Sequence, residues 1–381
     1  MILIEKVIRY YKLIVNFIYR MGKGEMIIFF KTIRKLGLLL FVFTFLISGC
    51  IPKTETEKQE VNPIEKTSII APNVEMSEQY YRGVLPYKPS LLQGILGQIP
   101  NRLDSKSFEL GLLELAKTMY DPGKLVFQEG QILKPEDVQF DDFLVTITEH
   151  DYLSEEGNIE GIVIGLLVSP NYYVKEENGT YYKNEYGEKV VKEYTEEELE
   201  AKAKRLIEGL TSTIRQNASH PSIVFDVMKA QTKNMMIPGN FFLVGKVNQD
   251  ENNVEDWNKV DEAYLFLPDS TAIGFNDQFG DVSRGFNHFK GKMDEYLPGY
   301  AGITGLAKFV NGDLLELTIK VYTEFDSTVE LIQFIQFGVT MTEEYFSEDH
   351  QINFYVYSME QPKGIYVKKA NGESFMHIFR D

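Results

Sequence analysis

The sequence predicts an α+β protein whose folded part consists of two related units, each an antiparallel sheet covered on one face by a helix. Three observations predict this class. Runs of alternating apolar residues, typical of half-buried strands, occur in both halves of the chain. In each half, a segment with the apolar spacing of a helix follows the first two runs. Two more strand-like runs then follow, so each unit has the order strand, strand, helix, strand, strand.

The strands are assigned from apolar residues at every second position, which place one strand face against a core. In the first unit these runs cover residues 143–148, 161–168, 223–228 and 241–247. In the second they cover residues 302–310, 315–322 and 352–359, before a final hairpin through Ala370-Asn371-Gly372. Asn178-Gly179, in a tyrosine-rich stretch, and Asn311-Gly312 are further favoured hairpin turns.

One helix is expected in each unit. Thr195 and Glu198 have the spacing of a capping box for the first helix, and Ser327 and Glu330 for the second. One face of the first helix carries Leu199, Ala203, Leu206, Ile207, Leu210 and Ile214, and one face of the second carries Leu331, Ile332, Phe334, Ile335, Val339 and Tyr345. The relation between the units rests on this element order alone. The predicted domains are residues 78–255 and 256–381.

Residues 265–298 join the two units as a long connection rich in glycine and phenylalanine. Two interpretations are open, because such loops often bind ligands, whereas a long connection is also held to the body by its phenylalanines. The residues concerned are Gly274, Phe275, Phe279, Gly280, Gly285, Phe286, Phe289 and Gly291.

The only cysteine, Cys50, indicates where the protein is located. It closes the run Leu46, Ile47, Ser48, Gly49, Cys50, which is a bacterial lipobox. A basic segment and an apolar segment too short to span a bilayer precede it. Residues 1–49 are therefore expected to be a signal peptide, with the true start at Met26. The alternative is an ordinary buried thiol behind an anchor helix.

A diacylglyceryl group on Cys50, with fatty acids such as palmitate, would hold the protein on the extracytoplasmic face of the cell membrane. The expected partners are thus the membrane and the lipoprotein-processing enzymes. Residues 50–77 have the composition of a disordered tether. Residues 1–49 carry eight Lys and Arg against two Asp and Glu, so of the total charge of −17 the remainder carries −23. This acidic body excludes nucleic acid as a partner.

A search for catalytic and metal-binding motifs identifies no residue. The five histidines are scattered, and no phosphate-binding loop or G-x-S-x-G motif is present, so neither a metal site nor a cofactor is expected. Glu149-His150-Asp151 combines suitable groups for a metal or acid-base site. Adjacent strand residues point to opposite faces, however, so a solvated strand end is the preferred interpretation.

The segment after the tether carries a family resemblance. Tyr80-Tyr81-Arg82-Gly83-Val84-Leu85-Pro86-Tyr87-Lys88-Pro89-Ser90 resembles the CamS sex-pheromone lipoproteins of low-GC Gram-positive bacteria. Weaker matches are Asn101 to Asp104, Phe127 to Gln131, Gly161 to Leu166 and Phe354 to Tyr357. Within the first stretch, Tyr80, Tyr81, Arg82 and Tyr87 are candidate binding residues. Packing at the edge of the domain is the preferred alternative for them.

The resemblance implies that a short apolar peptide from the end of the cleaved leader acts as a signal. In this chain the corresponding peptide is Phe43 to Gly49. Three functions are therefore considered. The first is a noncatalytic cell-surface lipoprotein that binds a peptide, glycan or envelope protein in an apolar or aromatic groove between the two units. The second is a pheromone precursor, and the third is an envelope hydrolase with converging carboxylates or histidines of perturbed pKa.

Overall fold

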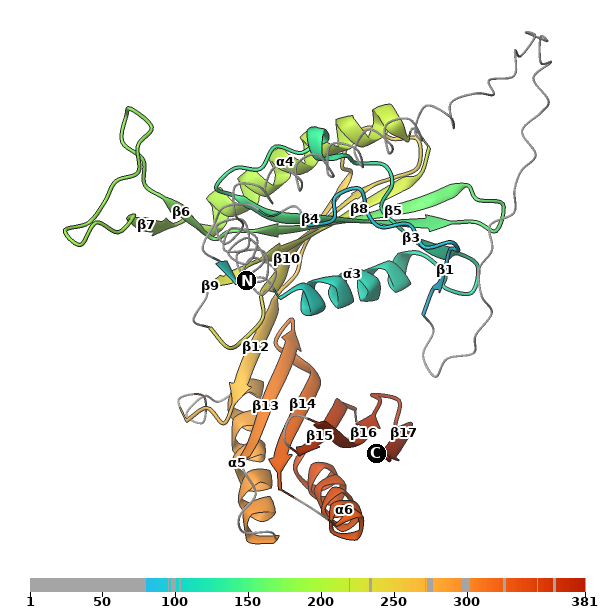
Figure 1. Ribbon diagram of the computed structural model, residues 1–381, viewed down its shortest axis with the longest axis vertical. Helices are drawn as coiled ribbons and strands as arrows, with labels where there is room; N and C mark the ends of the chain where they lie inside the picture. Colours follow the sequence, from blue (N-terminus) through green and yellow to red (C-terminus); the bar gives the residue numbers. More distant parts are fainter. Residues whose placement is uncertain are drawn as a thin grey trace, which may run out of the picture. The chain divides into compact units, whose positions relative to one another are not determined.

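The computed structural model has a mixed α+β fold, which confirms the predicted class (Figure 1). Its described part contains a seven-stranded sheet, a six-stranded sheet and two sheets of two strands each. The structure describes residues 80–94, 96, 101–102, 104–218, 220–232, 235–270, 272, 277–296, 302–324, 327–347, 349–358 and 361–380. The leader, the lipobox, the tether and Met26 lie outside these residues.

The seven-stranded sheet has the strand order β1-β3-β4-β5-β8-β10-β11. Neighbouring strands are antiparallel except for two parallel pairs, β1 with β3 and β5 with β8. The strands are β1 (Arg82–Gly83), β3 (Val126–Glu129), β4 (Leu144–Leu153), β5 (Ile159–Val168), β8 (Ser222–Lys229), β10 (Asn240–Val247) and β11 (Asp256–Lys259).

Two helices pack on opposite faces of this sheet (Figure 1). Helix α4 (Glu196–Asn217) connects β5 to β8, and it begins at the predicted capping box, in which the backbone N–H of Glu198 donates to Thr195 Oγ1 over 3.2 Å. Its apolar face packs on Ile164 and Phe225, among others. Helix α3 (Ser105–Met119) covers the other face, where Phe108 and Leu112 are buried.

The six-stranded sheet follows the chain in simple order, β12-β13-β14-β15-β16-β17. Only β14 and β15 are parallel. Its core lies between one face of the sheet and the helices α5 (Gln278–Tyr296) and α6 (Thr328–Tyr345). The strands are β12 (Glu262–Leu267), β13 (Gly302–Val310), β14 (Asp313–Thr323), β15 (Gln351–Ser358), β16 (Gln361–Lys368) and β17 (Ser374–Ile378).

Short elements complete the described part. Strand β2 (Asn101–Arg102) pairs with β9 (Gln231–Thr232), and β6 (Asn171–Tyr173) pairs with β7 (Val191–Glu193). A 3₁₀ turn, η1 (Pro135–Asp137), precedes β4. In the described residues, no helix combines the length and the apolar character needed to cross a membrane.

The two large sheets share one strand order. Strands β3-β4-β5-β8-β10-β11 and β12 to β17 follow each other in space with the same sequence of parallel and antiparallel pairs. The expectation of purely antiparallel sheets is wrong for one pair in this shared order. A helix returns the chain to the end where the previous strand began, so β5 and β8, and likewise β14 and β15, run parallel. The first sheet also has helices on both faces, not on one.

The connection at residues 265–298 is not a long loop, because residues 278–296 form helix α5. Val282, Phe286, Phe289 and Met293 are buried at helical spacing, so the phenylalanines pack in the core. Gly285 permits a close approach, since a Cβ there would lie 3.1 Å from the carbonyl oxygen of Tyr345. The sequence analysis also assigned no helix to residues 105–119, although Phe108, Leu112 and Ala116 have helical spacing.

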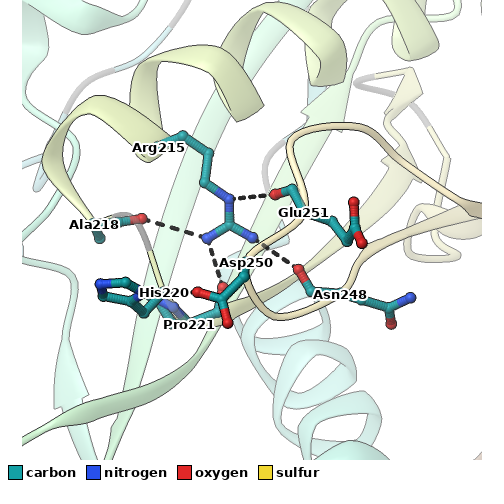
Figure 2. A network of polar contacts seen from close by, with 7 residues as sticks. All are labelled: Arg215, Ala218, His220, Pro221, Asn248, Asp250 and Glu251. Atoms are coloured by element: carbon teal, nitrogen blue, oxygen red, sulfur yellow. Dashed lines mark hydrogen bonds and ion pairs between the residues drawn. The ribbon is translucent and has the colours of Figure 1, made fainter.

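The end of α4 is joined to the loop after β10 by one arginine (Figure 2). Arg215 donates from Nε to the carbonyl of Glu251 over 2.6 Å and from Nη2 to that of Asn248 over 3.0 Å. Its Nη1 donates to the carbonyl oxygen of Pro221 over 2.6 Å. The guanidinium group thus binds carbonyl oxygens of the loop after β10 and of the segment before β8 at the same time. A lysine ammonium group cannot do this in the same geometry.

We expect Arg215→Lys to lower the free energy of unfolding by roughly 1–3 kcal/mol, because hydrogen bonds from the planar guanidinium group are lost while the charge is kept. Chemical denaturation followed by circular dichroism measures this change. The matched control is Arg205→Lys, an exposed residue of the same helix whose Nε donates to the carbonyl of Ala201 in its own helix. Equal stability of the two variants would contradict this role of Arg215.

Candidate functional site

One face of the six-stranded sheet is partly exposed. The burial of β13 alternates strictly, so Ile303, Ala307 and Phe309 face the helices while the residues between them point the other way. Strand register places side chains of four strands together on this second face. We call it the tyrosine face and define it by Leu306, Lys320, Tyr322, Tyr355, Tyr357, Ile365 and Val367.

The aromatic part of the tyrosine face is ordered by ring contacts. Tyr322 and Tyr357 stack with ring centroids 5.5 Å apart, and Tyr355 lies 6.4 Å from Tyr357. Tyr322 is 40% exposed, and the other two rings are half-buried. Partial burial, and secondarily Tyr322, raise the pKa of Tyr357, which favours the neutral phenol. The rings therefore offer flat apolar area with hydroxyl groups at the edges.

A polar network borders these rings on the same face. Glu316 accepts hydrogen bonds from Asn353 Nδ2 over 2.7 Å and from Thr318 Oγ1 over 2.9 Å. Gln351 Nε2 adds a longer bond of 3.4 Å to the same carboxylate. Because several donors already bind it, Glu316 acts as a structural acceptor that orients neighbouring amides.

At the β12 end of this face the polar groups are buried. Lys308 Nζ lies 2.7 Å from Glu262 Oε2, and the other oxygen of Glu262 accepts from the backbone N–H of Phe241. Burial, followed by the charge of Glu262, raises the pKa of Asp226 well above its usual value and favours its neutral form. Burial likewise raises the pKa of Tyr264. The bond from Phe241 to Glu262 thus joins β10 of the first sheet to β12, and Lys308 extends the contact to β13.

An apolar or aromatic groove was expected between the two units. The cavity found in the described part has four charged residues in its lining instead. A space of about 390 Å³ is lined by α4, by β10 and β11 of the first sheet, by the link before β12 and by the turn between β13 and β14, including Glu196, Glu200, Lys259, Asp261 and Asn311, with Phe242 as its aromatic residue. Lys259 and Glu200 form an ion pair of 2.7 Å within it. The aromatic surface lies instead on the tyrosine face.

The four candidate binding residues near the start of the folded body make different contacts. Tyr81 packs on Tyr152 and donates from its hydroxyl to the carbonyl of Tyr120 over 2.6 Å. Lys117 lies over the ring of Tyr80, and Arg82 pairs with Glu155 at 3.2 Å. Tyr87 is 66% exposed. Tyr80, Tyr81 and Arg82 thus pack at the edge of the domain, which is the preferred alternative of the sequence analysis.

The interpretation of Glu149-His150-Asp151 as a solvated strand end is wrong. Strand β4 continues to Leu153 and pairs with β3, and all three side chains are buried. They do point to opposite faces, as predicted. The carboxylate of Glu149 accepts from the backbone N–H groups of Ile132 and Leu133, both over 2.7 Å, whereas His150 packs on Phe127. In the described part, no group of three His, Cys, Asp or Glu side chains is placed to hold a metal ion.

Burial shifts the pKa values of these three groups in opposite directions. Burial, and then the charge of Glu149, raise the pKa of Asp151 well above its usual value, and burial also raises that of Glu149. Burial lowers the pKa of His150 to about 4. The two carboxyl groups hold the chain at residues 131–133, because Asp151 accepts from the backbone N–H of Gln131 and Glu149 from those of Ile132 and Leu133.

A model of the family described as "CamS sex pheromone cAM373 precursor" matches residues 87–144 and 139–374. The chain belongs to the CamS family. The matched residues include the tyrosine face and the strands of both large sheets except β1 and most of β17. The resemblance found in the sequence is thereby confirmed. No curated protein matches the chain.

Two solved structures support the CamS fold. A sex pheromone precursor from Lactobacillus salivarius has a TM-score of 0.71 at 19% identity, over 82% of this chain and 99% of that one. The C-terminal domain of the staph-cAM373 precursor from Staphylococcus aureus has a TM-score of 0.60 at 20% identity, over 72% of this chain and 96% of that one. At these identities the similarity concerns the fold.

The tyrosine face was not predicted from the sequence. The alternation in residues 315–322 predicted one buried face, but its phase was shifted at the start, since Leu314 is buried and Leu315 is 52% exposed. A register shift between Lys308 and Phe309 accounts for this difference. The sequence signal for the rings of this face is the alternation itself, because Tyr322 alternates with Ile319 and Val321, and Tyr355 and Tyr357 alternate with the apolar residues of their own strand.

The raised pKa of Asp151 predicts a pH dependence of stability. An acid whose pKa is higher in the folded than in the unfolded protein stabilises the fold below its unfolded pKa, and this contribution is lost as the pH rises toward the folded value. Asp151→Asn replaces the neutral acid with an amide of similar shape. We therefore expect the variant to gain stability relative to the wild type as the pH rises above about 4.

Urea denaturation from pH 4 to pH 8 measures this difference. The exposed Asp256→Asn is the matched control and should follow the wild type throughout. A constant difference between Asp151→Asn and the wild type over the whole pH range would show that Asp151 does not titrate with a raised pKa.

Proposed function

We propose that this CamS-family protein is a lipid-anchored cell-surface lipoprotein whose body binds peptidoglycan without catalysing a reaction. The observation that carries the binding function is the tyrosine face, where aromatic rings remain partly exposed on a sheet and the amide of Gln351 lies on the same side. The lipobox supports the anchor. The signal peptide and residues 50–77, as a tether, belong to the same proposal.

The anchor and tether suit a ligand in the cell wall. Two acyl chains on Cys50 hold a protein stably where one chain holds it only weakly. A chain of 28 residues, from 50 to 77, reaches at most about 90 Å when fully extended. A body held on such a tether meets the polymer that lies outside the membrane.

The chemistry of the tyrosine face fits a polymer of sugars and short peptides. Tyr322 and Tyr357 offer ring faces to apolar C–H groups, while their hydroxyls and the amide of Gln351 offer hydrogen bonds. The core on the opposite side holds the strands in place, so little conformational entropy is lost on binding. Peptidoglycan presents both kinds of group on one polymer.

Noncatalytic binding is favoured over hydrolysis by the location of the perturbed groups. A hydrolase requires acids or bases of perturbed pKa in contact with a substrate. Here the carboxyls with strongly raised pKa, Asp151 and Asp226, are 0% and 4% exposed. Glu316, which borders the tyrosine face, is bound by neighbouring donors.

Removal of two rings should weaken binding to purified peptidoglycan. We expect Tyr322→Ala with Tyr357→Ala to lower the affinity in a sedimentation assay, by about threefold to tenfold for each ring. Val329→Ala, a 63% exposed residue of α6 at the side of the helices, is the control and should bind as the wild type does. If the double variant binds as tightly as the wild type, or if the wild type does not sediment with peptidoglycan, the proposal that the tyrosine face binds peptidoglycan is wrong.

Loss of the lipidated residue should release the protein from the membrane. We expect Cys50→Ala to shift the body from the membrane fraction to the soluble fraction of the culture, because the acyl chains can no longer be attached. Cell fractionation with immunoblotting measures this shift. A Cys50→Ala protein that remains tightly membrane-bound after cleavage of the leader would exclude the lipid anchor.

The family description favours a second product, a peptide pheromone from the leader. The peptide Phe43 to Gly49 would be released in a second cleavage, independently of the body. Mass spectrometry of the medium from the same cultures detects it directly. If the peptide is absent from wild-type medium, the leader yields no pheromone and the function lies in the folded body.

A further inference from the structure

Strand β17 forms an outer edge of the six-stranded sheet and is uncharged. It is last in the strand order, and its residues, Ser374–Ile378, contain no charged side chain. Phe375 is 61% and Met376 is 41% exposed. An edge strand with exposed apolar residues and no charge is open to pairing with another strand.

The hydrogen bonds of β17 show which of its backbone groups point outward. Lys369 N–H donates to the carbonyl of Glu373 over 2.8 Å, and Phe379 N–H donates to that of Lys363 over 3.0 Å. Since such bonds occur at every second residue of an antiparallel strand, the odd-numbered residues of β17 bond to β16. The N–H and C=O groups of Ser374, Met376 and Ile378 therefore point away from the sheet.

The outer strands of the seven-stranded sheet differ from β17. Strand β1 has two residues, which is too short to pair with a further strand over any length. Strand β11 carries Asp256 and Lys259 at its two ends. Short length and charge are the two features by which natural sheets protect their edges. Strand β17 is five residues long and uncharged, so neither feature protects it.

We propose that β17 pairs with β17 of a second copy of this chain, antiparallel and with the two-fold axis at Met376. In this register Met376 lies opposite its own equivalent, and Ser374 lies opposite Ile378. All three outward-facing residues of each copy then face outward-facing residues of the other, so each copy donates three backbone hydrogen bonds. The two sheets become one sheet of twelve strands.

Charge supports pairing with a second copy in this register. The uncharged strand is flanked by Glu373 on one side and Arg380 on the other. Antiparallel pairing centred on Met376 places Arg380 of each copy opposite Gly372 of the other, directly beside Glu373. Glu373, which pairs with Lys369 of its own copy at 3.4 Å, then lies opposite Phe379, so like charges of the two copies are kept apart, whereas a parallel arrangement in register would place them side by side.

Pairing also extends the tyrosine face. Phe375 and His377 point to the same side as Val367 and Ile365, with which they pair in register. Their rings lie 6.2 Å apart and stack. In the paired form these rings fill the centre of one surface that runs from the tyrosine face of one copy to that of the other.

The test substitutes Met376, whose N–H points outward. Met376→Pro removes the donor at the two-fold axis but no hydrogen bond to β16, so the sheet itself is retained. Met376→Ala shortens the side chain and keeps the N–H, which makes it the matched control. The full-length protein is extracted in detergent micelles, and its mass is measured by sedimentation equilibrium over a range of concentrations.

We expect the wild type and Met376→Ala to reach the mass of two chains, and Met376→Pro to remain at one. Circular dichroism verifies that the proline variant is folded, and Ile378→Pro at a second outward-facing position should give the same result. A wild type of one chain at all concentrations overturns the proposal. A Met376→Pro protein that remains paired, or a Met376→Ala protein that dissociates, likewise overturns pairing through the backbone.

Discussion

The packing of a crossover helix on two parallel strands is the interaction on which the rest of the structure depends. Helix α4 connects β5 to β8, and α6 connects β14 to β15. In each case the buried face of the helix covers the two strands that it joins. Because such crossovers are right-handed, the helix must lie on one particular face of its sheet. The other face is then left for other elements to cover.

The two sheets differ in what covers this other face. In the first sheet, α3 packs there, and Tyr152 is fully buried together with Phe108 and Leu112. In the second sheet, the equivalent face is the tyrosine face, where Tyr322 is 40% exposed. The same strand order therefore produces a closed core in one sheet and a partly open, aromatic surface in the other. This difference is the structural basis for a binding function.

Much of the fold follows from local sequence signals. The start of α4 agrees with its capping box, and the hairpin at Asn311-Gly312 has both residues in the left-handed region, as its sequence predicts. Helix α5 was missed because its glycines resemble those of a loop, although Phe286, Phe289 and Met293 have helical spacing. Here burial against the sheet outweighs the low helix propensity of glycine.

The candidate site was harder to predict because exposure depends on distant residues. Tyr152 and Tyr322 both occupy strand positions that face away from a crossover helix. Tyr152 is buried by Tyr81 and Tyr120, which lie far from it in the sequence. The error at Glu149 to Asp151 has the same cause, because the local sequence does not show which distant residues bury these side chains. Local alternation shows which face a residue is on, but not whether that face is covered.

Hydroxyl-radical footprinting of tyrosines, with and without purified peptidoglycan, measures directly whether the tyrosine face is the binding surface. We expect Tyr322 to be oxidised in the free protein and protected by peptidoglycan, while Tyr152 is unreactive in both states. Tyr186, which is 79% exposed on the arm between β6 and β7, should keep its rate. Protection of Tyr186 with an unchanged rate at Tyr322 would contradict the assignment of the tyrosine face as the binding surface.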